Sequence, residues 1–390
     1  GLIGRLSGCI KKDVMKSSLS RAPRSKNERA ILSLIRQQQS MPKAQIAKAL
    51  ALSAQAATVN INKLEEDKLL LRDAPVKGRV GQPSVPFRLN PDGAFSFGLK
   101  IGRRRFDLIL VDLQSTQRAS VSVEVNEASV DELKSFLETH IPQLISQLEP
   151  ELRSHVCGLG VAMPFDIWQW QAASDTATNT LSQWQNFDLK GYLESQFNLP
   201  VYISNDNNAA CCAELSLGNP NNYSDFLYVY LGAFLGGAVV INHQLLEGKS
   251  GNAGAIGSML NADREQLLSQ CSLLSLQSEF DKQQLSISVY ELTDSQFTMH
   301  KLLVQPWLEK SAEAISIAMH NSLSLLDMQA VIIDSPLPSK ALEQLKQLSI
   351  AAFARLDSRG LRSCEVGLGV CGEKAQSIGS AQLALSHHYF

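Results

Sequence analysis

Three successive arginines, Arg103, Arg104 and Arg105, stand in the short run KIGRRR. The apolar run Phe95–Leu99 precedes them and FDLILVDL follows, so the spacing predicts the turn of a β-hairpin. Guanidinium groups form strong charge-assisted hydrogen bonds with carboxylates and phosphates. The turn is therefore a candidate anion site. The alternative is that these side chains face water or pair with acids.

A second group of polar side chains follows helical spacing from Ser53 onward. Ala57, Ile61 and Leu64 recur on one face of this predicted helix, whereas another face carries small polar groups and few charges. Amides and hydroxyls of this kind hydrogen-bond to base edges in the DNA major groove. The candidate base-contacting residues are Ser53, Gln55, Thr58 and Asn62.

The elements around this helix fit a winged helix-turn-helix. The sequence predicts a first helix over residues 25–39, capped by Ser25, and a short second helix capped by Ser40. Strand-like runs at 69–73 and 84–90 would form the wing. The loop between them carries Lys77, Arg79 and Gln82, which we expect to lie along the phosphate backbone or in the minor groove. Periodicity alone leaves open a plain helical bundle with a polar surface.

The charge distribution separates a basic head from an acidic body. Residues 1–90 contain 17 Lys and Arg against 6 Asp and Glu, whereas residues 91–390 contain 19 against 32. A basic region of this kind indicates a polyanionic partner, most often nucleic acid, and a solvated tail is the alternative. We expect a basic flexible arm over residues 1–24, a winged helix-turn-helix over 25–92 and a further domain over 93–390.

Composition argues against the membrane, disulfide and metal classes. No run approaches the roughly 18 apolar residues of a membrane span. The seven cysteines are scattered and include no C-x-x-C pair, so neither a disulfide framework nor a zinc cage is indicated. We expect a cytoplasmic protein without a cofactor, a bound metal or a membrane contact.

Beyond residue 93, strand-like runs alternate with predicted helices. Clear examples are FDLILVDL from Phe106, VCGLGVAM from Val156 and AVIID from Ala330. A meander of strands followed by crossover connections predicts an α/β body with two lobes.

Four further segments have distinctive residue patterns. Gly158, Gly160 and Pro164 form a Gly-x-Gly-x-x-x-Pro pattern, PVYISNDNNAACCAE starts at Pro200, GKSGNAGAIGSM starts at Gly248, and GQPS starts at Gly81. In these segments the chain resembles the ROK family of bacterial sugar kinases and sugar-responsive repressors, and GQPS resembles the Gly-Arg-Pro-Pro wing motif of the repressors. The resemblance implies an actin-like, two-lobed domain behind an N-terminal winged helix.

The departures from the family's kinases concern their phosphate and metal sites. The kinases carry Asp-x-Gly-Gly-Thr where this chain has Lys100–Arg104, and Gly-Thr-Gly where it has Gly232–Phe234. The acid that helps to hold magnesium and the bare amides that hold ATP phosphates are therefore replaced. The family's zinc-binding histidine and cysteines are replaced by Ser258 and a segment containing only Cys271, which we expect to be a buried apolar residue. We expect neither phosphate transfer nor a zinc site.

The sugar-binding segment of the family is better preserved. The resemblance places Asp206 at the kinases' general base, with Asn205 beside it, where the pair could hydrogen-bond to sugar hydroxyls. Asn252 matches another sugar contact, but Ala255 replaces a sugar-binding glutamate and Ser258 replaces the histidine. The candidate effector residues are Asn205, Asp206, Asn252 and Ser258, for a sugar or a sugar phosphate. The alternative is that Asp206 only caps its helix in a domain that binds no ligand.

Together these features predict a sugar-responsive DNA-binding transcriptional regulator, a repressor of carbohydrate uptake or catabolism genes. The resemblance implies a homodimer or homotetramer on a palindromic operator of double-stranded DNA. Two alternatives stay open. One is a sugar kinase with an appended DNA-binding head, and the other is a constitutive DNA-binding protein with a ligandless scaffold.

Overall fold

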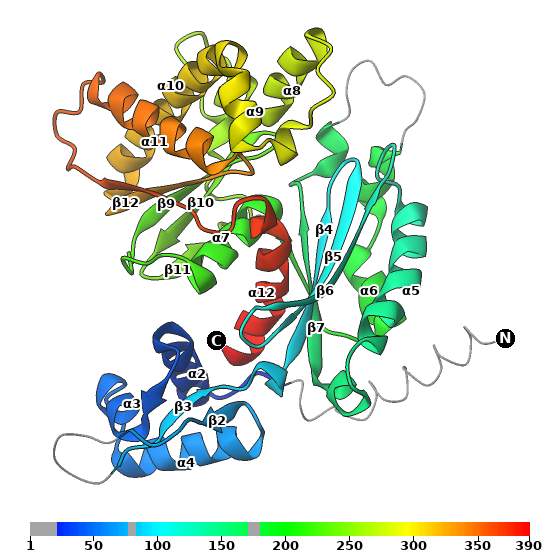
Figure 1. Cartoon of the computed structure of the whole chain (residues 1–390), viewed down its shortest axis with the longest axis vertical. Coiled ribbons are helices and arrows are strands. Elements are labelled where there is room, and N and C mark those ends of the chain that lie inside the picture. The colour runs from blue at the N-terminus through cyan, green and yellow to red at the C-terminus, as the bar shows by residue number, and fades with distance from the viewer. Residues whose placement is uncertain (1–21, 77–82, 171–179) are drawn as a thin grey trace. The chain divides into compact units, whose positions relative to one another are not determined.

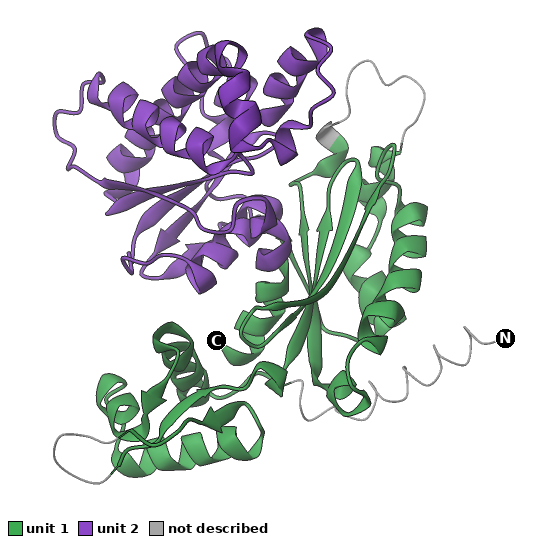
Figure 2. Cartoon of the chain, in the orientation of Figure 1, with its two compact units in different colours: residues 1–204, 380–390 green, residues 205–379 purple. Residues whose placement is uncertain are grey.

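The computed structural model describes residues 22–76, 83–170 and 180–390. The chain divides into two compact units, residues 1–204 with 380–390 (unit 1) and residues 205–379 (unit 2), as Figure 2 shows. The expected boundary after residue 92 therefore lies inside unit 1. The predicted basic arm over residues 1–24 falls outside the described residues except for its last three. None of the helices in the described ranges combines the length and the apolar composition of a membrane-spanning segment.

The head combines helices with a small antiparallel sheet (Figure 1). The helices are α2 (Lys26–Gln38), α3 (Lys43–Ala49) and α4 (Ala54–Glu66). The sheet has the order β1-β3-β2, formed by β1 (Met41–Pro42), β3 (Pro86–Leu89) and β2 (Leu70–Arg72). Ser25 caps α2 as predicted, because its Oγ accepts a hydrogen bond from the Glu28 amide at 3.3 Å. The arrangement is the predicted winged helix-turn-helix.

The second helix of the head begins later than the sequence predicts. Ser40 does not cap it: the N-cap position is Pro42, and the Ser40 hydroxyl donates to Asp73 Oδ2 at 2.6 Å. Met41 and Pro42 instead form β1, which pairs with β3. α3 therefore starts at Lys43 and has no side-chain cap. The expected cap was wrong because strand pairing takes the residues that would have formed the first helical turn.

The body part of unit 1 is a sheet with the strand order β6-β5-β4-β7-β8. Its strands are β4 (Phe95–Ile101), β5 (Arg105–Asp112), β6 (Gln117–Glu124), β7 (Val156–Met163) and β8 (Val201–Asn205). β4, β5 and β6 form an antiparallel meander, and β7 runs parallel to β4. Helices α5 (Val130–Ser146) and α6 (Leu189–Phe197) cover one face, where they pack on alternate apolar residues of β4 and β7 (Figure 1).

Unit 2 repeats this strand arrangement. Its order is β11-β10-β9-β12-β13, again an antiparallel meander followed by parallel strands. The strands are β9 (Phe226–Leu231), β10 (Leu235–Ile241), β11 (Gln244–Leu246), β12 (Ala330–Asp334) and β13 (Glu365–Leu368). One face packs against α7 (Asp206–Leu217). The other packs against α8 (Leu273–Lys282), α9 (Asp294–Met299), α10 (Lys301–Leu326) and α11 (Ser339–Ala354). The shared order confirms the predicted two-lobed α/β body.

The last helix, α12 (Ala375–Tyr389), makes two very close approaches to neighbouring elements. A Cβ on Gly160 of β7 would lie 1.6 Å from the carbonyl oxygen of Ser380. A Cβ on Gly379 of α12 would lie 1.6 Å from the carbonyl oxygen of Ala209 in α7. Both positions therefore require glycine. The Gly-x-Gly pattern seen in the sequence lets α12 lie directly on β7.

Candidate DNA interface and candidate effector site

Helix α4 has the two faces that the sequence predicts. Ala57, Ile61 and Leu64 are fully buried in the head. Gln55 and Asn62 are exposed on another face, and neither amide hydrogen-bonds to another described residue. Both side chains are therefore available to base edges in the major groove.

The two other predicted base-contacting residues occupy different positions on α4. Ser53 is the N-cap, and its Oγ accepts a hydrogen bond from the Ala56 amide at 3.1 Å. Thr58 is half-buried. Ser53 is therefore engaged within the helix, although its hydroxyl proton is still available to a phosphate oxygen.

A buried carboxylate fixes the orientation of α4 in the head. Glu28 of α2 accepts hydrogen bonds from Lys63 Nζ at 3.1 Å and from an Arg24 guanidinium nitrogen at 3.2 Å. Burial acts to raise the pKa of Glu28, but the bonds from Lys63 and Arg24 lower the pKa below its ordinary value. Arg24 also pairs with Asp67, which follows the end of α4. The helix that carries Gln55 is thus held at both its side and its end.

The predicted wing residues Lys77, Arg79 and Gln82 lie outside the described residues. The strands that lead to them are paired as a hairpin, with Leu70 opposite Leu89. Beyond the strands, Val76 and Ser84 exchange backbone hydrogen bonds of 2.9 and 3.2 Å. The two strands that flank the wing loop are therefore paired with each other. The DNA contacts of the loop itself stay a prediction.

The basic turn between β4 and β5 is a tight hairpin, as predicted. The Gly102 amide donates to the Arg105 carbonyl at 2.9 Å, and the Arg103 carbonyl accepts from the Ala128 amide at 2.7 Å. Arg105 is engaged by a neighbouring acid, because its Nε lies 2.7 Å from Asp107 Oδ1. Arg103 is half-buried and Arg104 is exposed, and neither pairs with an acid among the described residues. The anion site stays a prediction that depends on Arg103 and Arg104.

The second turn, between β9 and β10, forms hydrogen bonds within itself and with other segments of unit 2. The Gly232 amide donates to the Phe234 carbonyl at 3.1 Å. The Gly232 carbonyl accepts from the Leu273 amide at 3.0 Å, so the first turn of α8 lies against this loop. The Ser335 hydroxyl donates to the Leu231 carbonyl at 2.7 Å. The Gly232 amide is therefore occupied within the turn, whereas the other two bonds occupy carbonyl oxygens.

The candidate effector residues lie where two distant segments meet in unit 2. Asn205 is the N-cap of α7, and its Oδ1 accepts from the Asn208 amide at 2.7 Å. The side-chain amides of Asn205 and Asn208 both donate to the Gly251 carbonyl, the second at 3.2 Å. Asn252, the next residue, is half-buried. The segments that carry Asn205 and Asn252 are therefore brought together.

Two other predicted effector residues have different surroundings. Asp206 is half-buried in the first turn of α7, where a carboxylate is favoured by the helix dipole. It contributes, after burial and Asp334, to raising the pKa of Tyr230 on β9. Ser258 is exposed at the end of a short 3-10 helix (Ile256–Ser258).

Asn208 is a residue of this site that sequence reasoning missed. Its side chain is 1% exposed, and its Oδ1 atom has no hydrogen-bond partner among the described residues. A buried acceptor without a donor is costly, so it is a natural partner for a ligand hydroxyl. The signal in the sequence was its place three residues after the N-cap Asn205, in the run NDNN.

The loop that reaches the α7 N-terminus depends on a glycine. Gly254 has φ +84°, and a Cβ there would lie 2.8 Å from the Ala238 Cα atom of β10. Only glycine fits this combination of conformation and contact. The loop that carries Asn252 is therefore fixed against the sheet.

Cys271 is a buried apolar residue, as predicted. It is fully buried among apolar side chains, and burial raises its pKa to about 12 although a hydrogen bond with Ser311 acts to lower it. Within the described residues, no three His, Cys, Asp or Glu side chains are grouped so that they could hold a metal ion.

Two family models match the chain. The ROK family matches residues 96–386, and a winged helix-turn-helix DNA-binding family matches residues 24–70. The xylose repressor of Bacillus subtilis (strain 168) is 24% identical over 376 residues, which cover 93% of this chain and 95% of the repressor.

Two solved structures are similar in fold. One is a ROK family transcriptional regulator described as a homologue of the E. coli MLC protein, with a TM-score of 0.65, 16% identity and coverage of 93% of this chain and 96% of that one. The other is a ROK family glucokinase from Streptomyces griseus in complex with glucose and AMPPNP, with a TM-score of 0.58, 18% identity and coverage of 74% and 99%.

Proposed function

The chain belongs to the ROK family, and we propose that it is a sugar-responsive DNA-binding repressor of carbohydrate uptake or catabolism genes. The observation that carries this proposal is the exposed face of α4, where Gln55 and Asn62 are available to bases. The match to a winged helix-turn-helix DNA-binding family over residues 24–70 supports it. So does the similarity to a xylose repressor over 93% of the chain.

We propose further that the protein is not a kinase. Arg103 and Arg104 stand in the first hairpin turn, where a nucleotide phosphate would need bare amides. The second turn is bonded to itself and to the start of α8. ATP-dependent phosphorylation of any sugar by the purified chain would overturn this part of the proposal.

The effector that we propose is a free sugar bound near the N-terminus of α7. Asp206 and the acceptor oxygen of Asn208 supply hydrogen-bond acceptors there, and sugar hydroxyls are donors. Xylose is the first sugar to test, because the relative that covers 93% of this chain is a xylose repressor. We also propose that the protein binds a palindromic operator as a homodimer or homotetramer, which would place two α4 helices in successive major grooves.

A thermal-shift screen of the full chain tests the effector. The panel contains xylose, other pentoses, hexoses, disaccharides, their phosphates, and ATP with magnesium. A ligand that binds the folded state raises the unfolding midpoint. One sugar should do so, and Asp206→Ala should lose the effect. A panel in which nothing changes the midpoint would favour a constitutive DNA-binding protein with a ligandless scaffold.

A further inference from the structure

We propose that α12 transmits the sugar-bound state of unit 2 to the DNA-binding head. This inference rests on the proposed function and specifies how the effector regulates the head. α12 starts in unit 2 and ends in unit 1. It is one helix of 15 residues without a proline, about 22 Å long. The helix contains one pair that can kink, Gly379–Ser380, but both residues are packed against neighbouring backbone, so we expect a displacement at its start to reach its end.

The start of α12 is fixed to the helix that carries the candidate effector residues. Gly379 lies against the backbone of Ala209, one turn after the N-cap of α7. Glu214, also in α7, accepts a hydrogen bond at 3.1 Å from the amide of Val370, in the segment that leads into α12. The Gly372 amide in the same segment donates to the buried Asp334 at 3.2 Å. A shift of α7 on ligand binding therefore displaces the start of α12.

The end of α12 is held by the first helix of the head. Arg29 donates to the Ser386 carbonyl at 3.1 Å. The Arg36 guanidinium lies over the Phe390 ring, 3.7 Å from its centroid, and the Ser33 hydroxyl donates to the Phe390 carbonyl at 3.4 Å. Arg29, Ser33 and Arg36 are four and three residues apart, so they share one face of α2. We call these contacts the α2–α12 junction.

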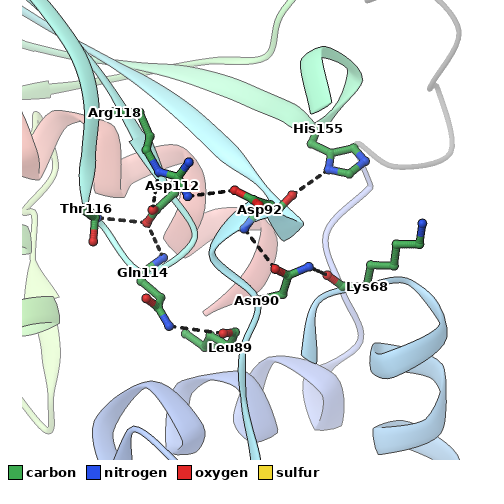
Figure 3. A network of polar contacts seen from close by, with 9 residues as sticks. All are labelled: Lys68, Leu89, Asn90, Asp92, Asp112, Gln114, Thr116, Arg118 and His155. Atoms are coloured by element: carbon green, nitrogen blue, oxygen red, sulfur yellow. Dashed lines mark hydrogen bonds and ion pairs between the residues drawn. The ribbon is translucent and has the colours of Figure 1, made fainter. Parts of the chain in front are cut away.

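The short linker between head and body is also held in place, as Figure 3 shows. Asn90 Nδ2 donates to a carbonyl of the head at 2.7 Å. Arg118 bridges the linker and the sheet, because it pairs with Asp92 and with the buried Asp112 at 2.8 Å each. His155 Nδ1 lies 2.8 Å from the Asp92 carbonyl. This network ties the linker to the sheet of unit 1, whereas the α2–α12 junction is the contact that joins the first helix of the head to α12.

The test compares Phe390→Ala and Arg36→Lys with the wild-type full chain. Phe390→Ala removes the ring under the guanidinium, and Arg36→Lys keeps the charge but loses the planar stacking group. Gln38→Ala, at the exposed end of α2, is the matched control. Each protein is measured for its thermal shift with the sugar found in the screen, and for its affinity for operator DNA with and without that sugar.

The expected result distinguishes sugar binding from the effect of the bound sugar on DNA binding. Both variants should keep the thermal shift, and should bind the operator without sugar within about threefold of wild type, since neither side chain is on α4. Sugar should change operator affinity by roughly 5- to 150-fold in wild type and in Gln38→Ala, but less than about twofold in the junction variants. Variants that respond to sugar like wild type would overturn this inference alone. A wild-type chain whose operator affinity no sugar changes would overturn the proposed function as well.

A different observation supports a second inference: we infer that Val59 contacts the C5 methyl group of a thymine. Val59 is 60% exposed, although its neighbours toward the core are fully buried. It lies between Gln55 and Asn62 on one stripe of α4, at spacings of four and three residues. Thymine is the base that presents an apolar methyl group in the major groove, beside the hydrogen-bonding edges that amides contact.

Replacing thymine with deoxyuridine tests this contact, because the change removes only the methyl group. The full chain first selects its operator from a random-sequence DNA pool, and each thymine is then replaced in turn. At one position per half-site, deoxyuridine should weaken wild-type binding about fourfold, as expected for one buried methyl group. Val59→Ala should lose this difference, whereas Val76→Ala, an exposed valine outside α4, should keep it. A Val59→Ala protein that still distinguishes the two bases at every position would refute the inference.

Discussion

The solvent face of α4 and the N-terminus of α7 both carry asparagine and other polar side chains, but the two regions differ in the hydrogen bonds that these side chains make within the protein. On α4, the amides of Gln55 and Asn62 make no hydrogen bond with the described residues. On α7, Asn205 is engaged at both ends of its amide, by the Asn208 backbone and by the Gly251 carbonyl. The amides of the first region are therefore available to a partner, whereas asparagines of the second region hold a loop in place. In the second region, the acceptors that we propose for the effector are those of Asp206 and Asn208.

The largest expected effect comes from removing the available amides on α4. Gln55→Ala and Asn62→Ala should each lower operator affinity by about 5- to 150-fold, since a bidentate amide–base contact contributes about 1–3 kcal/mol. Fluorescence anisotropy with the selected operator measures the loss, and Gln38→Ala is the control. An equal loss on unrelated DNA would contradict base contact and assign these residues to the backbone.

Replacing an asparagine by alanine should affect stability, and not only DNA binding, when the residue lies at the N-terminus of α7. Asn205→Ala removes the cap and the bond to Gly251, so it should lower the free energy of unfolding by about 1–2 kcal/mol. Asn62→Ala, matched in chemistry but exposed, should leave stability within about 0.5 kcal/mol of wild type. Urea unfolding compares them. Asn205→Ser keeps a capping oxygen and should recover part of the loss. Equal free energies of unfolding for the two alanine variants would contradict the structural role of Asn205.

A smaller effect on stability is expected from Asp334, the buried acid that accepts a hydrogen bond from Gly372 in the segment that leads to α12. Burial raises the pKa of Asp334 from 3.8 to about 6, although hydrogen bonds from Tyr228 and the Ser335 amide act to lower it. Because the folded pKa exceeds the unfolded one, the contribution to stability is present below about pH 4 and is lost as pH rises through about 6. The wild type should lose about 1 kcal/mol more than Asp334→Asn between pH 5 and pH 7. Urea unfolding at both pH values measures the free energy of unfolding of each protein. An equal change between the two pH values in wild type and Asp334→Asn would refute the prediction.

The smallest expected effect concerns the basic turn. Arg103 and Arg104 resemble the α4 amides, because they pair with no acid among the described residues. Arg103→Ala and Arg104→Ala should leave the unfolding free energy within about 0.5 kcal/mol of wild type. If the turn is an anion site, calorimetric titration should show weaker binding of a sugar phosphate and unchanged binding of the free sugar. Variants that bind both ligands like wild type would exclude the anion site.

Local patterns predicted much of the fold. The apolar spacing of Ala57, Ile61 and Leu64 identified the buried face of α4, and short apolar runs identified β4, β5, β7 and β12 in the two body sheets. The cap at Ser40 was wrong because a strand pairing formed with residues more than 40 positions away, which local propensity does not contain. The unpartnered oxygen of Asn208 could not be predicted either, because the packing of this side chain involves a loop more than 40 positions away, at Gly251. The role of Gly379 likewise depends on a helix 170 positions earlier in the chain.

The most direct test of the account is the affinity of the full chain for its selected operator, measured by fluorescence anisotropy with and without xylose and the other sugars of the screen. One free sugar should change this affinity at least about fivefold, and Asp206→Ala should bind the operator normally but no longer respond. An operator affinity that no sugar alters, or a response that persists in Asp206→Ala, would contradict the proposed sugar response.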